Sequence, residues 1–194
     1  MRGYFAIGTE DMSKPRNLGN LIRSAHAFGA SFVFTVNAEF DRRAVRNADT
    51  SATSLHVPLY QYHSMQAFQL PQGCSLVGVE LTDDAVDLPS FRHPERAAYI
   101  MGPERGSLSP AMIQRCEFVV KIPTKFCVNV ATAGAILMYD RLLSSNQFAA
   151  RPWTPGGKLF PVKKEAKHGG VFTRSAEKRA RLAARETNAS PQGD

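Results

Sequence analysis

A chain of 194 residues with 43% hydrophobic and 21% charged residues has the composition of a soluble globular protein and the length for one hydrophobic core. Its net charge of +7 lies mostly in residues 151–194, where ten lysines and arginines stand against four acids. A phosphate-rich partner or a solubilising surface explains this equally well. Because no apolar run is long enough for a signal-peptide core or a membrane-spanning helix, we expect a cytoplasmic protein with no membrane contact.

The first predicted elements are a strand over residues 3–8, a helix over 18–28 and a strand over 31–36. The helix has one apolar face and a stop signal at Gly29. Polar residues crowd its start and an arginine lies inside it; these are Lys14, Arg16, Asn17, Asn20 and Arg23. Taken alone, the segment indicates a surface helix with a solvated arginine.

The alternation of strands and helices continues over residues 75–81, 97–102, 110–115, 117–122 and 129–143, the third and fifth of these being helices. This spacing predicts an α/β fold, with a mostly parallel sheet and helices on both faces. Such sheets bind ligands at the carboxyl ends of their strands, so the loops that follow the three strands are the candidate binding loops. Residues 42–70 give no clear pattern.

Two of these loops carry more than a simple turn needs. In GPERGSLS, Gly102 and Gly106 let a ligand approach the backbone and Glu104 adds a carboxylate, although a tight connection also uses glycines. The chain has neither a P-loop nor a G-x-G-x-x-G motif. Asn129 is a good N-cap for the helix over 129–143, which is apolar enough to be buried on several sides, as in a dimer interface.

The composition predicts a boundary after residue 147. Residues 1–147 form the predicted domain, and residues 148–194 form a basic linker and tail in which Pro, Gly and Lys replace the apolar residues. Residues 175–186 have the pattern of a short helix with basic residues along one face. Such a helix is marginal in isolation, so disorder without a partner is an equal expectation.

The cysteines and histidines argue against a disulfide framework and against a metal cofactor. Cys74, Cys116 and Cys127 are odd in number and have no close pairing, which predicts three free thiols. The five histidines stand at no recognisable ligand spacing.

Three segments in order carry a family resemblance. NLGNLIR, from Asn17 to Arg23, fits N-x-G-x-x-x-R; YIMGPERGSLS fits a strand followed by G-P-E-x-G-x-L-S; and IPTKFCVNVATAGAILMYD fits I-P followed by S-L-N-V-S and an apolar helix. At this spacing they resemble the three motifs of the SpoU branch of the SPOUT superfamily, the S-adenosylmethionine-dependent RNA 2′-O-ribose methyltransferases. The resemblance covers about residues 3–143.

The resemblance implies a homodimer whose α/β domain ends in a C-terminal trefoil knot. Nothing in the periodicity shows a knot, and the rarity of knotted chains would argue against one. It also implies that S-adenosylmethionine lies in the loops of the second and third motifs. The matching cofactor-binding residues are Leu81, Gly102, Ile122, Cys127 and Val128. Cys127 and Ala131 replace the two serines of the family motif, so hydroxyl contacts there are weakened while main-chain contacts survive.

Four residues match the family's catalytic positions: Asn17, Arg23, Glu104 and Asn129. We expect Arg23 to act as a cation that stabilises charge on the 2′-oxygen, since a guanidinium does not give up its proton, although the family has also been discussed with arginine as the base. Asn17, Glu104 and Asn129 would position it, the ribose or the cofactor loop. The resemblance puts Arg23 of one subunit near the cofactor of the other.

The expected partner is RNA, tRNA rather than rRNA, since small members of the family often act on tRNA. Its phosphates would meet Lys14 and Arg16 in the first motif and Lys178 and Arg181 in the tail. Two other functions stay open. One is a non-catalytic RNA-binding protein on the same fold, which the loss of both serines favours and the retention of the four catalytic-position residues disfavours. The other is an RNA base methyltransferase, which the N-x-G-x-x-x-R motif disfavours.

Overall fold

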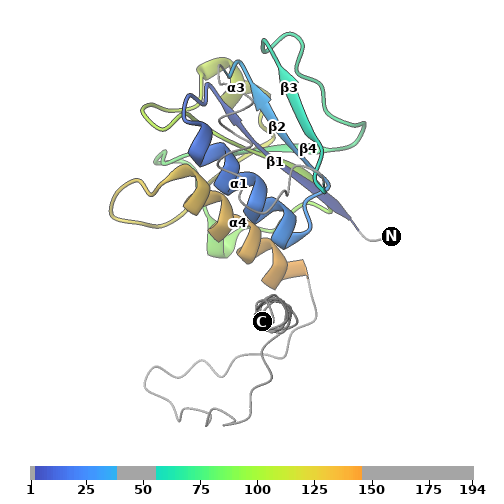
Figure 1. Ribbon diagram of the computed structural model, residues 1–194. Coiled ribbons are helices and arrows are strands. Elements are labelled where there is room, and N and C mark those ends of the chain that lie inside the picture. The colour runs from blue at the N-terminus through green and yellow to red at the C-terminus, as the bar shows by residue number, and fades with distance from the viewer. Residues whose placement is uncertain (1–2, 39–55, 146–194) are drawn as a thin grey trace, which may run out of the picture. The chain divides into compact units, whose positions relative to one another are not determined.

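The computed structural model describes residues 3–38 and 56–145 (Figure 1). Within them, one seven-stranded sheet has the order β3-β2-β1-β6-β4-β7-β5, and every neighbouring pair is parallel. The strands are β1 Tyr4–Glu10, β2 Phe32–Val36, β3 Leu59–Tyr62, β4 Ser75–Val79, β5 Val86–Asp87, β6 Arg96–Met101 and β7 Phe118–Lys121. The prediction of an α/β fold with a parallel sheet is confirmed.

The strand sequences bury both faces of the sheet. Along β1, Phe5 and Ile7 point to one face and Ala6 points to the other, as the two-residue period of a strand requires. Each face has its own hydrophobic core, and the central strands β1 and β6 contribute buried residues to both. A continuous apolar run such as YFAIG is therefore the pattern of a central parallel strand, because both sides of such a strand are covered.

Helices α1 (Pro15–Phe28) and α4 (Val130–Ser145) cover one face and pack against each other (Figure 1). Gly134 makes this contact close, because a Cβ there would lie 2.5 Å from Cδ1 of Leu21. Helix α1 begins three residues earlier than predicted, with Pro15 in its first turn, where a missing N–H costs nothing. It ends at Phe28 and is capped by Gly29, whose φ of 77° suits glycine.

Helix α3 (Pro110–Arg115) and the loops around it contribute to the core of the other face. Its start was predicted correctly: Ser109 accepts a hydrogen bond from the N–H of Met112, and Pro110 follows it. A short 3-10 helix, η2 (Leu88–Ser90), lies between β5 and β6.

Several element ends differ from the prediction, and two strands were missed. The first strand runs to Glu10 and not to residue 8, and α4 runs to Ser145 and not to residue 143. The strand over 75–81 ends at Val79 and the strand over 117–122 ends at Lys121, because the chain leaves the sheet while its sequence remains apolar. Helix α4 begins at Val130, one residue after its cap. The strands β3 and β5 were missed; β3 is a short, partly exposed strand at the edge of the sheet, and β5 has only two residues.

The three cysteines are free thiols, as predicted. In the part of the chain that the structure describes, no group of three or more His, Cys, Asp or Glu residues could hold a metal ion, and no helix is long and apolar enough to cross a membrane. The predicted linker and tail, residues 148–194, lie outside the described residues, as do residues 39–55.

Candidate functional site

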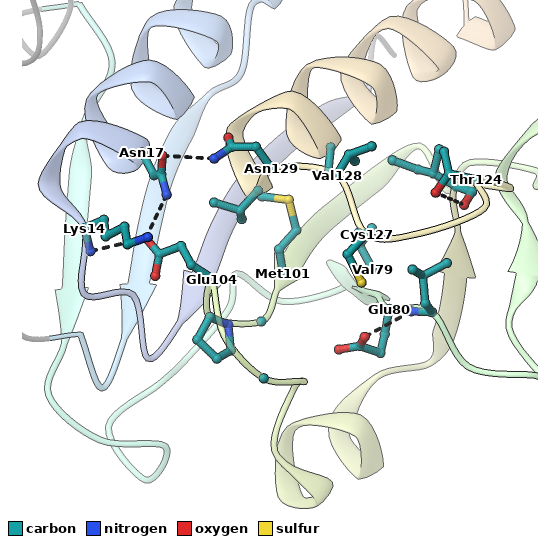
Figure 2. A pocket seen from close by; sticks show the side chains of 17 residues that line it. Lys14, Asn17, Val79, Glu80, Met101, Glu104, Thr124, Cys127, Val128 and Asn129 are labelled. Atoms are coloured by element: carbon teal, nitrogen blue, oxygen red, sulfur yellow. Dashed lines mark hydrogen bonds between the residues drawn. The ribbon is translucent and has the colours of Figure 1, made fainter.

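A cavity of about 300 Å³ lies at the carboxyl ends of β4, β6 and β7, beside the starts of α1 and α4 (Figure 2). This is the edge at which parallel α/β sheets bind ligands, and the volume is that of a small-molecule site. The cavity is lined by Lys14, Asn17, Val79, Glu80, Leu81, Met101, Gly102, Pro103, Glu104, Gly106, Ile122, Thr124, Cys127, Val128, Asn129, Val130 and Ala133.

The three motif segments of the sequence meet at this cavity. All five predicted cofactor residues line it, namely Leu81, Gly102, Ile122, Cys127 and Val128. Three of the four predicted catalytic residues line it as well: Asn17 from α1, Glu104 from the loop after β6, and Asn129 from the start of α4. Segments that are more than 80 residues apart in the chain therefore contribute to one site.

Glu104 joins the loop after β6 to the start of α1. Its Oε1 accepts hydrogen bonds from Nδ2 of Asn17 at 2.9 Å and from the N–H of Lys14 at 3.2 Å. Its Oε2 accepts from Oγ of Ser13 at 3.4 Å. One carboxylate thus fixes the first turn of α1 against the cavity wall.

These contacts also set the charge state of Glu104. Burial acts to raise the pKa of this carboxyl, but the hydrogen bonds from Asn17 and from the backbone amides of Glu104, Ser13 and Lys14 outweigh burial and hold the pKa below its ordinary value. Glu104 is therefore a carboxylate at neutral pH, and a carboxylate only accepts hydrogen bonds.

The carboxylate determines the orientation of two side-chain amides. Because Glu104 can only accept, Asn17 must turn its Nδ2 toward it, so Oδ1 of Asn17 faces Asn129. Nδ2 of Asn129 donates to that oxygen at 3.1 Å, and Oδ1 of Asn129 accepts from the N–H of Ala131 at 2.9 Å (Figure 2). A directed chain of hydrogen bonds runs from the N-terminus of α4 through Asn129 and Asn17 to Glu104.

The loop after β6 is held by glycine and by two further acids. A Cβ on Gly102 would lie 2.8 Å from the backbone nitrogen of Leu108, so only glycine allows the loop to fold back on its own strand. Oε2 of Glu80 accepts from the N–H of Leu108 at 2.8 Å, and the buried Glu10 accepts from the N–H of Ser109 at 2.8 Å. The cavity wall formed by residues 102–109 is therefore held by the close packing at Gly102 and by the carboxylates of Glu80 and Glu10.

The remaining predicted residues lie elsewhere. Arg23 is exposed on α1, two turns beyond Lys14, and does not line the cavity. Arg16 is exposed in the first turn of α1. Lys178 and Arg181 lie outside the described residues.

Sequence reasoning missed two contributions to the site, from Glu80 and Glu10, and assigned a third residue, Lys14, to RNA alone. Glu80 was included in a strand, yet it follows the last residue of β4 and lines the cavity. Glu10 gave no signal, because its partner Ser109 is 99 residues away. Lys14, assigned to RNA, also lines the cavity. An acid directly after an apolar strand was the signal available for Glu80.

The fold is a parallel α/β sheet, and its cavity has the size of a small-molecule site, with apolar walls and a polar end formed by Asn17, Glu104 and Asn129. Residues 4–139 match the model of the SpoU rRNA Methylase family, and the chain belongs to this family.

Two curated relatives are named tRNA (guanosine(18)-2′-O)-methyltransferases. The chain is 29% identical over 138 residues to TARBP1 of Mus musculus, a match that covers 66% of this chain and 9% of that protein. It is 25% identical over 136 residues to the Escherichia coli K12 enzyme, covering 68% of this chain and 59% of the enzyme. The match thus spans less than two thirds of either relative.

Among solved structures, the SpoU methyltransferase AviRb from Streptomyces viridochromogenes resembles this chain with a TM-score of 0.65 and 22% sequence identity. The match covers 75% of this chain and 61% of AviRb. AviRb has also been solved in complex with its cofactor AdoMet, and that structure has a TM-score of 0.64 to this chain. At this identity the likeness establishes the fold.

Proposed function

We propose that this protein transfers a methyl group from S-adenosylmethionine to a ribose 2′-hydroxyl of RNA, with tRNA as the expected substrate. The observation that carries the proposal is the convergence of the three motif segments on one cavity, where Asn17, Glu104 and Asn129 form a single hydrogen-bonded chain. Membership of the SpoU family and the names of the two curated relatives support the reaction type.

The cavity fits S-adenosylmethionine in size and in chemistry. Its apolar walls suit an adenine ring, and Gly102 lets residues 107 and 108 fold back against the strand to form one of these walls. Leu81, Gly102, Ile122, Cys127 and Val128 would hold the cofactor, largely through main-chain groups and apolar contacts. When bound, the cofactor supplies a methyl group on a sulfonium centre.

The protein's own residues must handle a poor nucleophile, since a ribose hydroxyl holds its proton tightly at neutral pH. Arg23 would stabilise negative charge on the 2′-oxygen as a cation, because its guanidinium keeps its proton. Asn17 would orient the ribose or Arg23 from a fixed position, since Glu104 and Asn129 hold its amide on both sides. The proton would leave to another group or to water.

Arg23 is on the surface of α1, whereas the cavity lies beside the first turn of that helix. We therefore infer a homodimer in which Arg23 of one subunit reaches the cofactor of its partner. The apolar residues Ile136, Tyr139 and Leu143, which α4 leaves exposed, support a second copy as the cover. We also propose that this chain forms the trefoil knot of the family.

RNA phosphates would meet Lys14 and Arg16 beside the cavity and Lys178 and Arg181 in the basic tail. Deleting residues 151–194 is then expected to raise the apparent KM for RNA several-fold and to flatten its dependence on salt. The check is initial rates at two or more salt concentrations. Unchanged affinity at low and high salt would remove the tail from the binding site.

The function is tested by methyl transfer from isotopically labelled S-adenosylmethionine to unmodified small RNA and to unmodified ribosomal RNA, followed by digestion to nucleosides. Label in a 2′-O-methylated nucleoside from the small-RNA pool is the expected result. Label in a methylated base would instead identify a base methyltransferase. Cofactor binding without transfer to either pool would favour a non-catalytic RNA-binding protein.

A further inference from the structure

Glu80 is a charged residue of the cavity with no role in the chemistry described so far. It directly follows β4, and its carboxylate joins two loops (Figure 2). Oε1 accepts from the N–H of Leu81 at 3.0 Å, and Oε2 accepts from the N–H of Leu108 at 2.8 Å. The two oxygens are therefore held in place by main-chain groups.

The carboxylate of Glu80 retains acceptor capacity. A carboxylate has about four lone-pair positions, two on each oxygen. Among the described residues, each oxygen of Glu80 has one hydrogen-bond partner, and the side chain is only partly buried against the cavity. One acceptor position on each oxygen is thus left for a ligand. The two oxygens of the carboxylate are a fixed distance apart, and this distance suits two neighbouring hydroxyl groups.

Glu80 lies at the other end of the cavity from the proposed reaction centre. In Figure 2, Asn17 and Asn129 lie on one side of Met101, and Glu80 lies on the opposite side, below Cys127. With the methyl group near Asn17, the nucleoside of the cofactor would extend toward Glu80. The neighbouring hydroxyls of that nucleoside are on its ribose, and an acid at the end of a parallel strand is a known solution for binding ribose hydroxyls in α/β folds.

We propose that Glu80 recognises the ribose of the cofactor by accepting hydrogen bonds from its 2′- and 3′-hydroxyls. The inference rests on the proposed function. It adds a residue that discriminates ribose from deoxyribose, whereas the resemblance assigned the cofactor only to Leu81, Gly102, Ile122, Cys127 and Val128.

The experiment is isothermal titration of the full chain with S-adenosylhomocysteine and with its 2′-deoxy and 3′-deoxy analogues. The wild-type protein is expected to bind the ribose form about tenfold or more tightly than either analogue, because a hydrogen bond to a charged group is lost. In Glu80→Ala that preference should fall to about twofold or less. Glu80→Gln, which keeps one acceptor oxygen, should give an intermediate preference.

Glu117→Ala is the matched control, since this exposed carboxylate accepts from Oγ of Ser75 at 2.9 Å outside the cavity. It should keep the full preference, and the melting temperature of each variant without ligand monitors folding. If Glu80→Ala weakens all three ligands by the same factor, Glu80 only holds the loops and the inference is wrong. An unchanged preference would also overturn it. No binding of S-adenosylhomocysteine by the wild-type protein would overturn the proposed function itself.

Discussion

The amides of Asn17 and Asn129 each take part in two hydrogen bonds, and their direction follows from one ionised group. Glu104 accepts from Asn17, Asn17 accepts from Asn129, and Asn129 accepts from a backbone amide of α4. The residue types were visible in the sequence, but their partners were not, because Glu104 is 87 residues from Asn17. Only the parallel arrangement of β1 and β6 brings the loops that carry them together.

Gly102→Ala is expected to weaken cofactor binding by about tenfold or more. The new Cβ would meet backbone atoms of Ser107 and Leu108 at 2.8 to 3.0 Å, and a backbone cannot move aside cheaply, so the cavity wall must shift. Isothermal titration with S-adenosylhomocysteine measures the effect. Gly78→Ala is the control, because its Cβ would meet only side-chain atoms, the nearest being Sγ of Cys116 at 3.1 Å. Equal affinity in Gly102→Ala and wild type would contradict the prediction.

A second polar group at the residue scale lies away from the cavity. Nδ1 of His93 is 2.6 Å from the hydroxyl of Tyr99, and its Nε2 is 3.0 Å from Oδ2 of Asp140. Arg141 donates to the Tyr99 hydroxyl, so that hydroxyl donates to Nδ1 and the neutral ring donates to Asp140 through Nε2. Burial lowers the pKa of His93, and its contact with Asp140 opposes this without reversing it.

The lowered pKa predicts that stability falls with acidification. The unfolded chain binds a proton at His93 at a higher pH than the folded chain does, so the contribution is complete above the ordinary histidine pKa of about 6.5 and is lost as the pH falls below it. Between pH 7.5 and 5.5, the melting temperature of the wild type should therefore decrease more than that of His93→Gln. Equal decreases in the two proteins would show that His93 is not responsible.

At the scale of elements, the sequence predicted buried strands and capped helices well, and it predicted the last residue of each strand poorly. Gly29 and Ser109 are local signals, because each acts on its own backbone or on the next turn. Val79, by contrast, is the last residue of β4 although Leu81 continues the apolar pattern. Val79 is the last residue of β4 in register with both of its neighbours, β6 and β7, and no local pattern contains the extent of the neighbouring strands.

Asn129 is both the N-cap of α4 and a member of the hydrogen-bonded chain in the cavity. It caps α4 through Oδ1 and contacts Asn17 through Nδ2. Asn129→Asp should keep the cap and hence the stability, but its carboxylate cannot donate to Asn17, so methyl transfer should fall by about tenfold or more. Asn129→Ala should lose activity and also about 1 kcal/mol of stability. Thermal denaturation and initial rates separate the two roles; full activity in Asn129→Asp would leave only the cap.

For the whole molecule, the exposed apolar side of α4 and the position of Arg23 both support the proposed dimer. Ile136, Tyr139 and Leu143 are 37%, 45% and 37% exposed, and their spacing places them on one side of α4. The sequence predicted that α4 needs more cover than its own sheet provides, and α1 supplies only part of it. A second copy that covers α4 would also allow Arg23, exposed outside the cavity of its own chain, to take the catalytic role that we propose for it.

A shared site predicts complementation between two inactive variants. Arg23→Ala would lack the cation and Gly102→Ala would lack tight cofactor binding. At a cofactor concentration well below the dissociation constant of Gly102→Ala, each protein alone should therefore have about a tenth or less of the activity that the wild type shows at the same concentration. If Arg23 acts across the interface, a mixed dimer contains one site with both residues intact. Random exchange of equal amounts makes about half of the dimers mixed, and the mixture should then recover about one quarter of wild-type activity. If Arg23 acts within its own subunit, no site is complete and no activity returns, so initial rates before and after subunit exchange decide between the two arrangements.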